Sequence, residues 1–394
     1  MVRRLLYKRP RFLGNFGCDR RSGWCPDSAG FETTTLGDAV RLETYGIAAA
    51  PAGLRALFDR QQRPEGCWDW FELLAETTLS GRETALILAL VDGTGCAFSA
   101  LPVVTADGAV IRGLTSPFTT LFSPPLGGDE NARELGRLVA GKVGGKIRLD
   151  ALDMTDGAAR AFEQGLAAGG LVVARFRHFA NWSEQIGDFA DYWSSRESRL
   201  KSTVKRKTAA LQRDGRLVFE QIDMAVDWRR GADIYRAIYA RSWKPAEPHP
   251  RFMDGLLEKM GPRGIARLGI ATIDGLPAAA QIWLVQQGRA TIFKLAHDPA
   301  FDNQSPGTLL THWMLRQLHD KEGVRDIDFG RGDDAYKRLW LGFSRDRHGI
   351  LAADPRSFKG LATIAFDILP SKLAKWRRAR KEGISALPGQ DKKS

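Results

Sequence analysis

The chain has 394 residues, of which 43% are hydrophobic and 26% are charged, as in an ordinary globular protein of about two domains. No stretch approaches the roughly 18 to 20 uninterrupted apolar residues of a membrane helix, and the basic start Met1–Arg9 lacks the apolar run of a signal peptide. We therefore expect a cytoplasmic protein. The net charge of +12 favours anionic partners such as nucleotides, nucleic acid or acidic lipid surfaces.

Four cysteines are present, Cys18, Cys25, Cys67 and Cys96. They lie outside any paired C-x-x-C arrangement with downstream histidines. We interpret them as reduced thiols rather than as disulfides or zinc ligands, and we expect no metal site.

Short matches recur at a constant distance along the chain. The turn Asp92-Gly93 recurs as Asp274-Gly275, and Ser123-Pro124 recurs as Ser305-Pro306, in both cases 182 residues later. A constant offset indicates an internal repeat, in which two similar halves follow each other along the chain. The predicted organisation is an N-terminal extension (1–35), a first half (36–180), a second half (181–360), and a basic C-terminal helix and tail (361–394).

Hydrophobic periodicity predicts the same order of elements in both halves. In the first half we expect strands at 84–91, 96–104 and 109–114, a helix at 130–140 and a strand at 146–152. In the second half we expect an antiparallel meander at 266–273, 278–285 and 290–296, a helix from Ser305 to about His319, and a strand at 324–329 parallel to the third strand. The fold class is α/β (α+β), with two mixed central sheets flanked by helices.

Basic residues are dense between Arg196 and Arg213, on a predicted helix that opens the second half. One interpretation is contact with an anionic acceptor or with the phosphate backbone of a tRNA. The other is a solvent-facing helix surface.

The segment Gln304-Ser305-Pro306-Gly307-Thr308-Leu309 stands where the predicted second-half helix begins. Ser305 is a good N-cap and Pro306 suits the first helical position. Free N–H groups and the positive end of the helix dipole suit a pyrophosphate, which Gly307 would let approach closely. A helix cap without a ligand is the alternative. In the first half, the equivalent segment 123–128 has a second proline and displaced glycines, and we interpret it as structural.

Three motifs carry a resemblance to a known family: Lys294-Leu295-Ala296-His297-Asp298, then Ser305 to Leu310, then Asp326 to Lys337. They resemble the GNAT-family acetyltransferases of the CelD-like group, named for cellulose and exopolysaccharide biosynthesis and related to Fem-type aminoacyl transferases. Tyr192–Arg199 and Ser242–Pro245 extend the similarity to roughly residues 192–355.

The resemblance implies a tandem GNAT fold that uses acetyl-CoA or another acyl-CoA. The thioester would lie along the third strand and the pyrophosphate at the helix start. The implied donor-binding residues are Leu295, Ala296, Gln304, Ser305, Pro306, Gly307, Thr308 and Leu309. Gln304 and Gly307 match the Gln-x-x-Gly of the family's phosphate loop, but Leu309 stands where Gly or Ala is usual, so an aminoacyl-tRNA donor stays open.

Acyl transfer to an amine needs a proton acceptor and an acid for the leaving thiolate. Tyr336 is the candidate acid, and a packed aromatic beside Trp340 is the alternative. Asp328 and Asp333 are the candidate bases, with Asp333 preferred and with His297, Glu247 and His249 as rivals. The candidate substrate-binding residues are Trp243, Lys244, Glu247, His297, Arg331 and Lys337.

The apolar stretch 361–368 is followed by the basic stretch 372–378, which contains Trp376. It would lie either on an acidic membrane surface at the inner face of the membrane or against the fold as a docked helix. The predicted function is N-acyl transfer from acyl-CoA to an amino group of a small or cell-envelope polysaccharide precursor. The alternatives are a tRNA-dependent Fem-like transferase, the one reading in which nucleic acid is a partner, and a non-catalytic scaffold.

Overall fold

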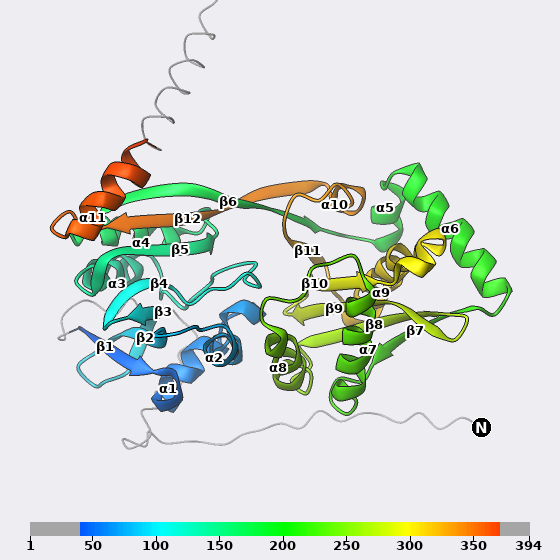
Figure 1. Ribbon diagram of the computed structural model, residues 1–394, viewed down its shortest axis with the longest axis horizontal. Helices are drawn as coiled ribbons and strands as arrows, with labels where there is room; N and C mark the ends of the chain where they lie inside the picture. Colours follow the sequence, from blue (N-terminus) through cyan, green and yellow to red (C-terminus); the bar gives the residue numbers. More distant parts are fainter. Residues whose placement is uncertain (1–39, 371–394) are drawn as a thin grey trace, which may run out of the picture.

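The computed structural model describes residues 40–370, which form one large mixed sheet flanked by helices (Figure 1). The first half contains β1 (Arg41–Gly46), α1 (Ala52–Asp59), α2 (Trp68–Thr77), β2 (Thr84–Val91), β3 (Ala97–Ala106), β4 (Ala109–Gly113), α3 (Asp129–Ala140), β5 (Val143–Leu152), α4 (Gly157–Ala168) and β6 (Val172–Gln185). The second half contains α5 (Phe189–Ser194), α6 (Ser198–Arg213), β7 (Leu217–Ile222), α7 (Trp228–Arg241), α8 (Pro250–Met260), β8 (Ala266–Ile273), β9 (Leu276–Gln286), β10 (Arg289–His297), α9 (Pro306–Glu322), β11 (Asp326–Arg331), α10 (Lys337–Trp340), β12 (Phe343–Ala353) and α11 (Phe358–Thr363).

The sheet has twelve strands in the order β1-β2-β3-β4-β5-β12-β6-β11-β10-β9-β8-β7. Counted inward from one edge, the strands are β1 to β5 and then β12; counted inward from the other edge, they are β7 to β11 and then β6. The strands at the same place in the two series correspond to each other: β8, for example, begins 182 residues after β2. The mixed α/β class is confirmed. The expectation of two separate sheets needs a correction, because the two halves share one continuous sheet.

Strands β6 and β12 join the halves by exchange. The last strand of the second half, β12, pairs with β5 of the first half, while β6 pairs with β11 of the second. The two exchanged strands also pair with each other from Phe343 to Ala353. The predicted boundary at residues 180 and 181 therefore falls inside β6, where the chain runs through the sheet without a linker.

The predicted elements of the second half are confirmed in position and direction. Strands β8, β9 and β10 form the antiparallel meander, and β11 pairs with β10 in parallel. On β8, Leu268 faces α7 beneath Gly231, whereas its neighbour Gly269 faces Met314 of α9. Since successive residues of a strand point to opposite faces, α7 and α9 cover opposite faces of this sheet.

The helix α9 starts at Pro306 as predicted, but Ser305 does not cap it with its side chain. Ser305 has a left-handed backbone, with φ of 54° and ψ of 49°. Its hydroxyl instead accepts a hydrogen bond from Lys207. The basic stretch predicted as a helix is α6, whose buried residues are Leu200, Val204 and Leu211.

Near its C-terminal end, the described chain forms α11, which packs on β5 and β12, and a π-helical turn (Ile364–Ile368), which packs on β6. The extension 1–35, Cys18, Cys25 and the basic stretch 372–378 lie outside the described residues. Within residues 40–370, no helix is long and apolar enough to cross a membrane.

Candidate active site

The strands β10 and β11 separate soon after they pair. Their parallel pairing covers three residue pairs, from Arg289 with Asp326 to Thr291 with Asp328. Just beyond, the register of β10 on β9 shifts between Ile292 and Lys294. A bulge of this kind bends a strand and interrupts its ladder, so the carbonyl end of β10 is released from β11.

A cavity of about 340 Å³ lies beside the released end of β10. It is bounded by β9, β10, the start of α9, and residues of α6 and α10. Its lining residues are Leu200, Trp243, Gln281, Leu295, His297, Asp302, Ser305, Pro306, Gly307, Thr308, Thr311, Tyr336, Leu339 and Trp340. Eight of these were predicted as site residues, from segments up to 93 positions apart in the sequence.

The start of α9 forms the cationic end of this cavity. Among the described residues no side chain caps α9, so the N–H groups of its first turn lack intrahelical acceptors. Lys207 of α6 reaches across and donates to Ser305 Oγ and to the carbonyl of Asn303, both at 2.7 Å. Burial and the neighbouring charge of Arg206 lower the pKa of Lys207. An ammonium group and a helix N-terminus therefore meet at one edge of the cavity, as an anionic group requires.

Gly307 lines the cavity in the first turn of α9. A Cβ on Gly307 would meet His297 Nδ1 at 3.5 Å, which is ordinary contact distance, so the fold itself tolerates a small side chain here. The carbonyl of Gly307 accepts hydrogen bonds from Gln281 Nε2 at 3.1 Å and from Thr311 Oγ1 at 2.9 Å. Gln281 and Thr311 also bond to each other at 2.7 Å, which fixes the first turn of α9 on β9.

The sequence analysis missed Gln281, Asp302 and Thr311. Gln281 had a detectable signal, because it is the one polar residue within the apolar strand stretch 278–285. A buried polar group in such a strand needs a partner, and the partners are the helix start and Trp283 Nε1, which donates to Gln281 Oε1 at 3.1 Å.

Three predicted donor residues lie outside the cavity lining. Ala296 and Leu309 are both 1% exposed and belong to the core. The resemblance leads one to expect Gly or Ala at position 309. The larger Leu309 side chain packs into the core, so it does not fill the cavity. Gln304 is half-buried, and its Oε1 makes no hydrogen bond within the described part of the chain.

Tyr336 also lines the cavity, on the turn that precedes α10. Burial, reinforced by the charge of Asp334, raises the pKa of its phenol well above the usual value. Within residues 40–370 its hydroxyl forms no hydrogen bond. Its ring lies 6.3 Å from that of Phe329, so the packed-aromatic reading also holds, and Tyr336 combines a packed ring with a protonated hydroxyl at the cavity.

His297 and Trp243 stand at the mouth of the cavity. The Nε2 of His297 lies 2.8 Å from Asp302 Oδ1, and its ring is 4.5 Å from the ring of Trp243. Trp243 is 60% exposed, so it presents a large apolar surface to solvent beside the imidazole. His297 is thus a histidine held by a carboxylate, which is the arrangement of a positioned general base.

Lys244 and Glu247 lie behind the cavity wall rather than in its lining. Lys244 Nζ donates to the carbonyl of Leu295 at 2.5 Å. Burial, together with the charge of Lys294, lowers the pKa of Lys244 to about 8. Glu247 accepts from Lys294 Nζ at 2.8 Å, so both predicted substrate residues hold β10 in place.

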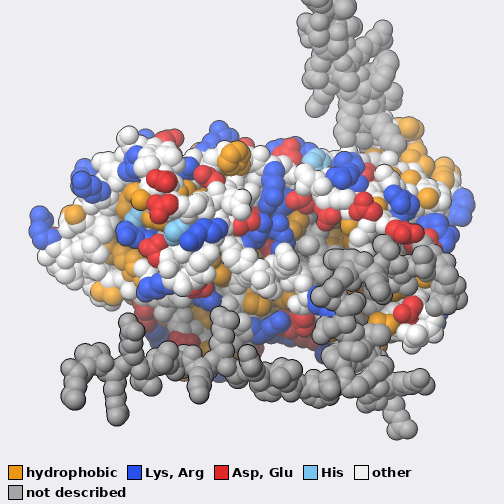
Figure 2. Space-filling model, turned by 180° about the vertical axis from the view of Figure 1, so that it is seen from behind, with side chains coloured by type: hydrophobic (Ala, Val, Ile, Leu, Met, Phe, Trp, Pro, Cys, Tyr) orange, Lys and Arg blue, Asp and Glu red, His pale blue; other side chains and the backbone are white. Residues whose placement is uncertain are grey.

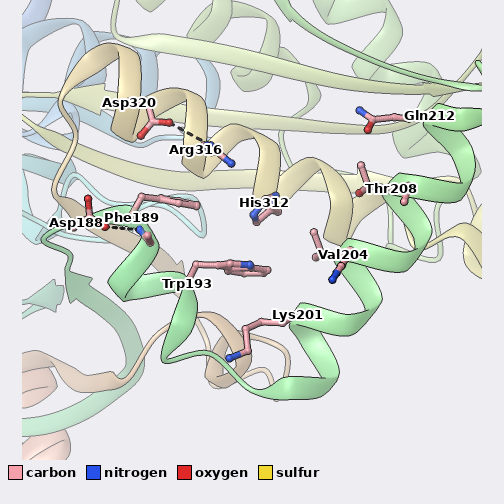
Figure 3. Close-up of a pocket in the computed structure, with 13 residues that line it drawn as sticks. Asp188, Phe189, Trp193, Lys201, Val204, Thr208, Gln212, His312, Arg316 and Asp320 are labelled. Atoms are coloured by element: carbon pink, nitrogen blue, oxygen red, sulfur yellow. Dashed lines mark hydrogen bonds and ion pairs between the residues drawn. The ribbon is translucent and has the colours of Figure 1, made fainter.

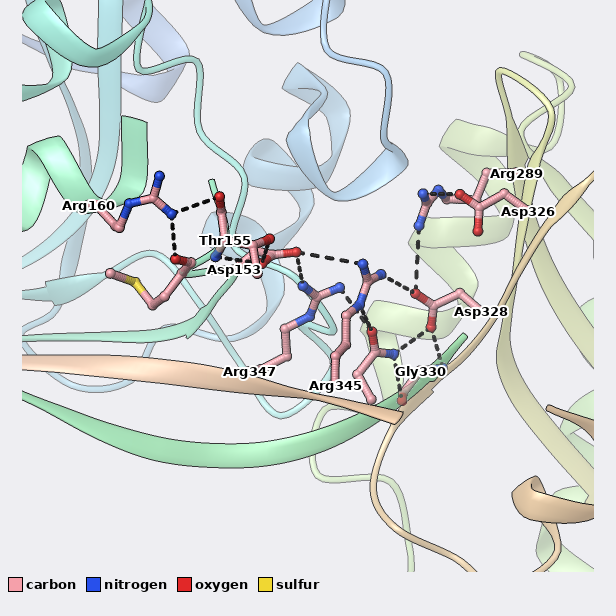
Figure 4. A network of polar contacts seen from close by, with 11 residues as sticks. Asp153, Thr155, Arg160, Arg289, Asp326, Asp328, Gly330, Arg345 and Arg347 are labelled. Atoms are coloured by element: carbon pink, nitrogen blue, oxygen red, sulfur yellow. Dashed lines mark hydrogen bonds and ion pairs between the residues drawn. The ribbon is translucent and has the colours of Figure 1, made fainter. Parts of the chain in front are cut away.

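Asp328 is committed to a network that joins the two halves (Figure 4). It is 3% exposed and accepts from Asn181 Nδ2 at 2.6 Å and from the N–H of Gly330 at 2.7 Å. Arg345 Nη2 lies 3.6 Å from its carboxylate. The predicted base Asp328 therefore does not reach the cavity.

Asp333, Arg331 and Lys337 also lie outside the cavity lining. Asp333 is exposed and accepts from Trp182 Nε1 at 3.0 Å. The guanidinium of Arg331 lies 4.7 Å over the ring of Phe179. Lys337 is buried and donates to the carbonyl of Arg331 at 2.6 Å, which closes the loop after β11.

A larger hollow of about 620 Å³ lies between α5, α6 and α9, and it contains none of the predicted site residues. Figure 3 shows Trp193 of α5 and His312 of α9 projecting into it. Their rings are 4.4 Å apart, and burial together with Arg316 lowers the pKa of His312 to about 4. The start of α5 in this hollow is already capped by the Asp188 side chain, and the hollow lies outside the residues that the resemblance implies for donor binding, so the smaller cavity stays the candidate active site.

Within the described residues no group of three or more His, Cys, Asp or Glu side chains is arranged to hold a metal ion. Cys67 is buried, and burial raises the pKa of its thiol to about 12.

Comparisons with known proteins bear on the same part of the chain. Residues 198–338, from α6 to α10, match the family model described as Acetyltransferase (GNAT) domain. No curated protein matches the sequence. The structure is similar to the crystal structure of FemX, with a TM-score of 0.54 and 11% identity over 78% of this chain and 96% of that chain.

Two further solved structures resemble it more loosely. One is the C-terminal domain of a putative lysylphosphatidylglycerol synthetase from Agrobacterium fabrum, with a TM-score of 0.45 and 12% identity over 79% of this chain and 94% of that chain. The other is a tandem GNAT protein from the clavulanic acid biosynthesis pathway, with a TM-score of 0.43 and 14% identity over 80% of this chain and 99% of that chain. At such identities the likeness to FemX concerns the fold alone. The family model covers residues 198–338, which contribute most of the cavity lining, so the part of the chain that forms the cavity is similar to GNAT acetyltransferase domains.

Proposed function

We propose that the protein is a cytoplasmic N-acyltransferase that binds an acyl-CoA in the cavity beside β10 and transfers the acyl group to an amine. The observation that carries this proposal is the meeting of the uncapped start of α9, Lys207 and Tyr336 around one cavity within the GNAT domain.

The groups around the cavity fit the parts of an acyl-CoA. The first N–H groups of α9, with Lys207, suit the pyrophosphate. The edge of β10 at Leu295 is released from β11 and can receive the pantetheine amides by hydrogen bonding, as an added strand would. When bound, the thioester supplies an activated acyl group; this chain's residues orient it and manage two protons.

We assign the two proton transfers to Tyr336, as the acid, and His297, as the base. A phenol with a raised pKa stays protonated at neutral pH and can donate its proton to the departing thiolate. His297, held by Asp302, is the one predicted base that lines the cavity, and we assign it the proton of the acceptor amine. The amine would enter past Trp243, whose exposed ring suits the apolar face of a sugar.

The acceptor class follows from that entrance and from the sequence motifs. The exposed indole beside an imidazole supports an amino sugar or a related cell-envelope polysaccharide precursor. The motifs that resemble the CelD-like group support the same class.

Calorimetric titration with acetyl-CoA and longer acyl-CoAs tests the proposal. The wild type should bind with micromolar affinity, and Gly307→Trp should abolish binding because the indole fills the helix start. Gly307→Ala is the matched control: its Cβ has ordinary contact space, so it should fold and retain most of the affinity. Absence of binding to every acyl-CoA by a folded wild type would overturn the proposal.

A second candidate function uses an aminoacyl-tRNA donor. The exposed cations Lys205 and Arg206 of α6 favour it, because they lie on the same helix as Lys207 at the cavity. Binding of aminoacylated tRNA with steep salt dependence, together with no binding of acyl-CoA, would select this function.

A further inference from the structure

The last elements of the described chain expose an apolar surface. Phe358 is 87% exposed, Leu361 52%, Phe366 79% and Leu369 49%. These four are nearly half of the nine large apolar side chains exposed within residues 40–370, and they fall within twelve consecutive positions. Figure 2 shows hydrophobic side chains gathered at this end of the molecule. We call these four residues the C-terminal apolar face.

The opposite side of the same segment is fixed to the fold. Ser357 caps α11 by accepting from the N–H of Gly360 at 2.9 Å. A Cβ on Gly360 would lie 1.9 Å from the carbonyl oxygen of Asp354, so the helix packs directly on the chain that follows β12. Thr363 is 4% exposed and Ile368 is fully buried. The exposed side chains are therefore presented by an anchored element and have no place left in the core.

The sequence around this face carries an excess of positive charge. Between positions 356 and 381 the sequence contains eight Lys or Arg residues and one acidic residue, Asp367. Six of the eight follow Pro370: Lys372, Lys375, Arg377, Arg378, Arg380 and Lys381. Basic residues next to exposed aromatic and leucine side chains suit an interface with negatively charged headgroups above an apolar interior.

We propose that the C-terminal apolar face and the adjoining basic stretch dock the protein on an anionic phospholipid surface. Figure 1 shows α11 at one end of the long axis, beside the elements of the first half, whereas β10 and α9 lie towards the other end. Docking through α11 therefore leaves the acyl-donor cavity accessible. The enzyme would act at a lipid surface, on acceptors held there.

Vesicle flotation of the full chain tests this proposal. The probes are vesicles of phosphatidylcholine alone and vesicles with about 30% phosphatidylglycerol, each at about 50 mM and about 500 mM NaCl. The wild type should float with the anionic vesicles at least roughly tenfold more than with the neutral ones, and high salt should reduce this difference severalfold because screening weakens the basic contacts.

Two variants separate the apolar and basic contributions. The double change Phe358→Ser with Phe366→Ser removes exposed side chains, so folding should be retained while flotation falls at least about tenfold. The matched control is Val218→Ser with Val226→Ser, at positions 58% and 75% exposed on a different part of the surface, which should float like the wild type. Glutamate at 372, 375, 377 and 378 should abolish the preference for anionic vesicles.

Light scattering after gel filtration distinguishes a second copy of the chain as the occupant of this face. A dimer that the Phe358 and Phe366 changes dissociate, with no flotation of the wild type, would overturn the proposal. So would equal flotation of the wild type and the double serine variant. Acetyl-CoA titration of the same variants should be unchanged, which keeps this test separate from that of the donor site.

Discussion

Lys207 and Ser305 join α6 to the start of α9, with Lys207 Nζ 2.7 Å from Ser305 Oγ across 98 positions of sequence. Ser305 can accept this bond because its left-handed backbone turns the hydroxyl away from the helix it precedes. The amino group is thereby fixed beside the uncapped N–H groups of α9.

Replacing Lys207 should weaken donor binding without unfolding the protein. We expect Lys207→Met to lower the affinity for acetyl-CoA about tenfold, the loss of one charge-assisted contact to a phosphate. Calorimetric titration measures it. Lys205→Met is the control, because Lys205 is exposed on the same helix, whereas Lys207 is the lysine that bonds to Ser305 and Asn303 at the start of α9; equal losses in both variants would contradict a specific role for Lys207.

Replacing Tyr336 should slow catalysis more than it weakens binding. Tyr336→Phe keeps the ring that packs near Phe329 and removes the hydroxyl, so we expect kcat to fall by about 10² to 10³ with little change in donor affinity. Release of the CoA thiol from acetyl-CoA, measured with a panel of amino sugars and amino acids, reports kcat. An unchanged kcat would leave Tyr336 a packing residue alone.

Replacing His297 should create a defect that a small base can repair. We expect His297→Ala to lower kcat by about 10² and exogenous imidazole to restore part of it, because the vacated space lies beside the cavity mouth. Asp302→Asn should give a smaller loss, since it alters only the orientation of the ring. Failure of imidazole to raise the rate of the alanine variant would argue for a structural role.

The exchanged strands should depend on one buried ion pair. Arg347 of β12 is 1% exposed and donates to Asp153, which follows β5, at 2.5 Å and to Asn181 of β6 at 2.9 Å. Burial would by itself raise the pKa of Asp153, but the Thr155 hydroxyl and the Arg347 charge outweigh it and lower that pKa to about 2.

We therefore expect Arg347→Met to reduce the free energy of unfolding by about 3 kcal/mol, because it removes the buried guanidinium from a partly buried carboxylate and from Asn181 Oδ1, which keep only Thr155 and Arg345 as donors. Urea denaturation measures the change. The control is Arg216→Met, which breaks an exposed pair with Asp274 and should cost less than about 1 kcal/mol. Comparable losses in the two variants would show that the buried pair does not secure the exchange.

His312 should make stability fall as the solution is acidified. Its pKa is lowered from 6.5 to about 4 in the folded protein, so between these values the unfolded chain binds a proton that the folded chain does not. Stability is then fully present above about pH 6.5 and is lost as the pH falls towards 4, by at most roughly 3 kcal/mol. His312→Phe should flatten this part of the curve of unfolding free energy against pH; parallel curves would contradict it.

The sequence predicted the strands and the helix start beside the cavity, because these features depend on residues that are close together in the chain. The meander from β8 to β10 follows from turn residues and alternating strands, and the start of α9 follows from Pro306. Leu295, Gly307 and Thr308 come from this short stretch, and a hairpin followed by a helix brings them together without help from distant residues.

Residues whose roles depend on distant partners were misjudged or missed. Asp328 looked like a base because it ends a strand beside other charges. In the fold it is enclosed by Asn181 of the first half and by Arg345 of β12, partners 147 and 17 positions away. The sequence did not distinguish Lys207 from the other basic residues between Arg196 and Arg213. Its role depends on the packing of α6 against α9.

The sequence by itself determined the order of the elements, the class of the fold and the place where a helix start could receive an anion, because periodicity, turns and caps act between near neighbours. The tertiary structure alone decided that the halves form one sheet by exchanging β6 and β12, and which charged side chains face the cavity. In strand exchange, β12 pairs with a strand of the first half instead of one of its own half. The backbone hydrogen-bonding groups of β12 are the same in both arrangements, so backbone hydrogen bonding alone does not distinguish them. The buried Arg347 bonds to Asp153 and Asn181, which are far from it in the chain, and these contacts favour the exchanged arrangement.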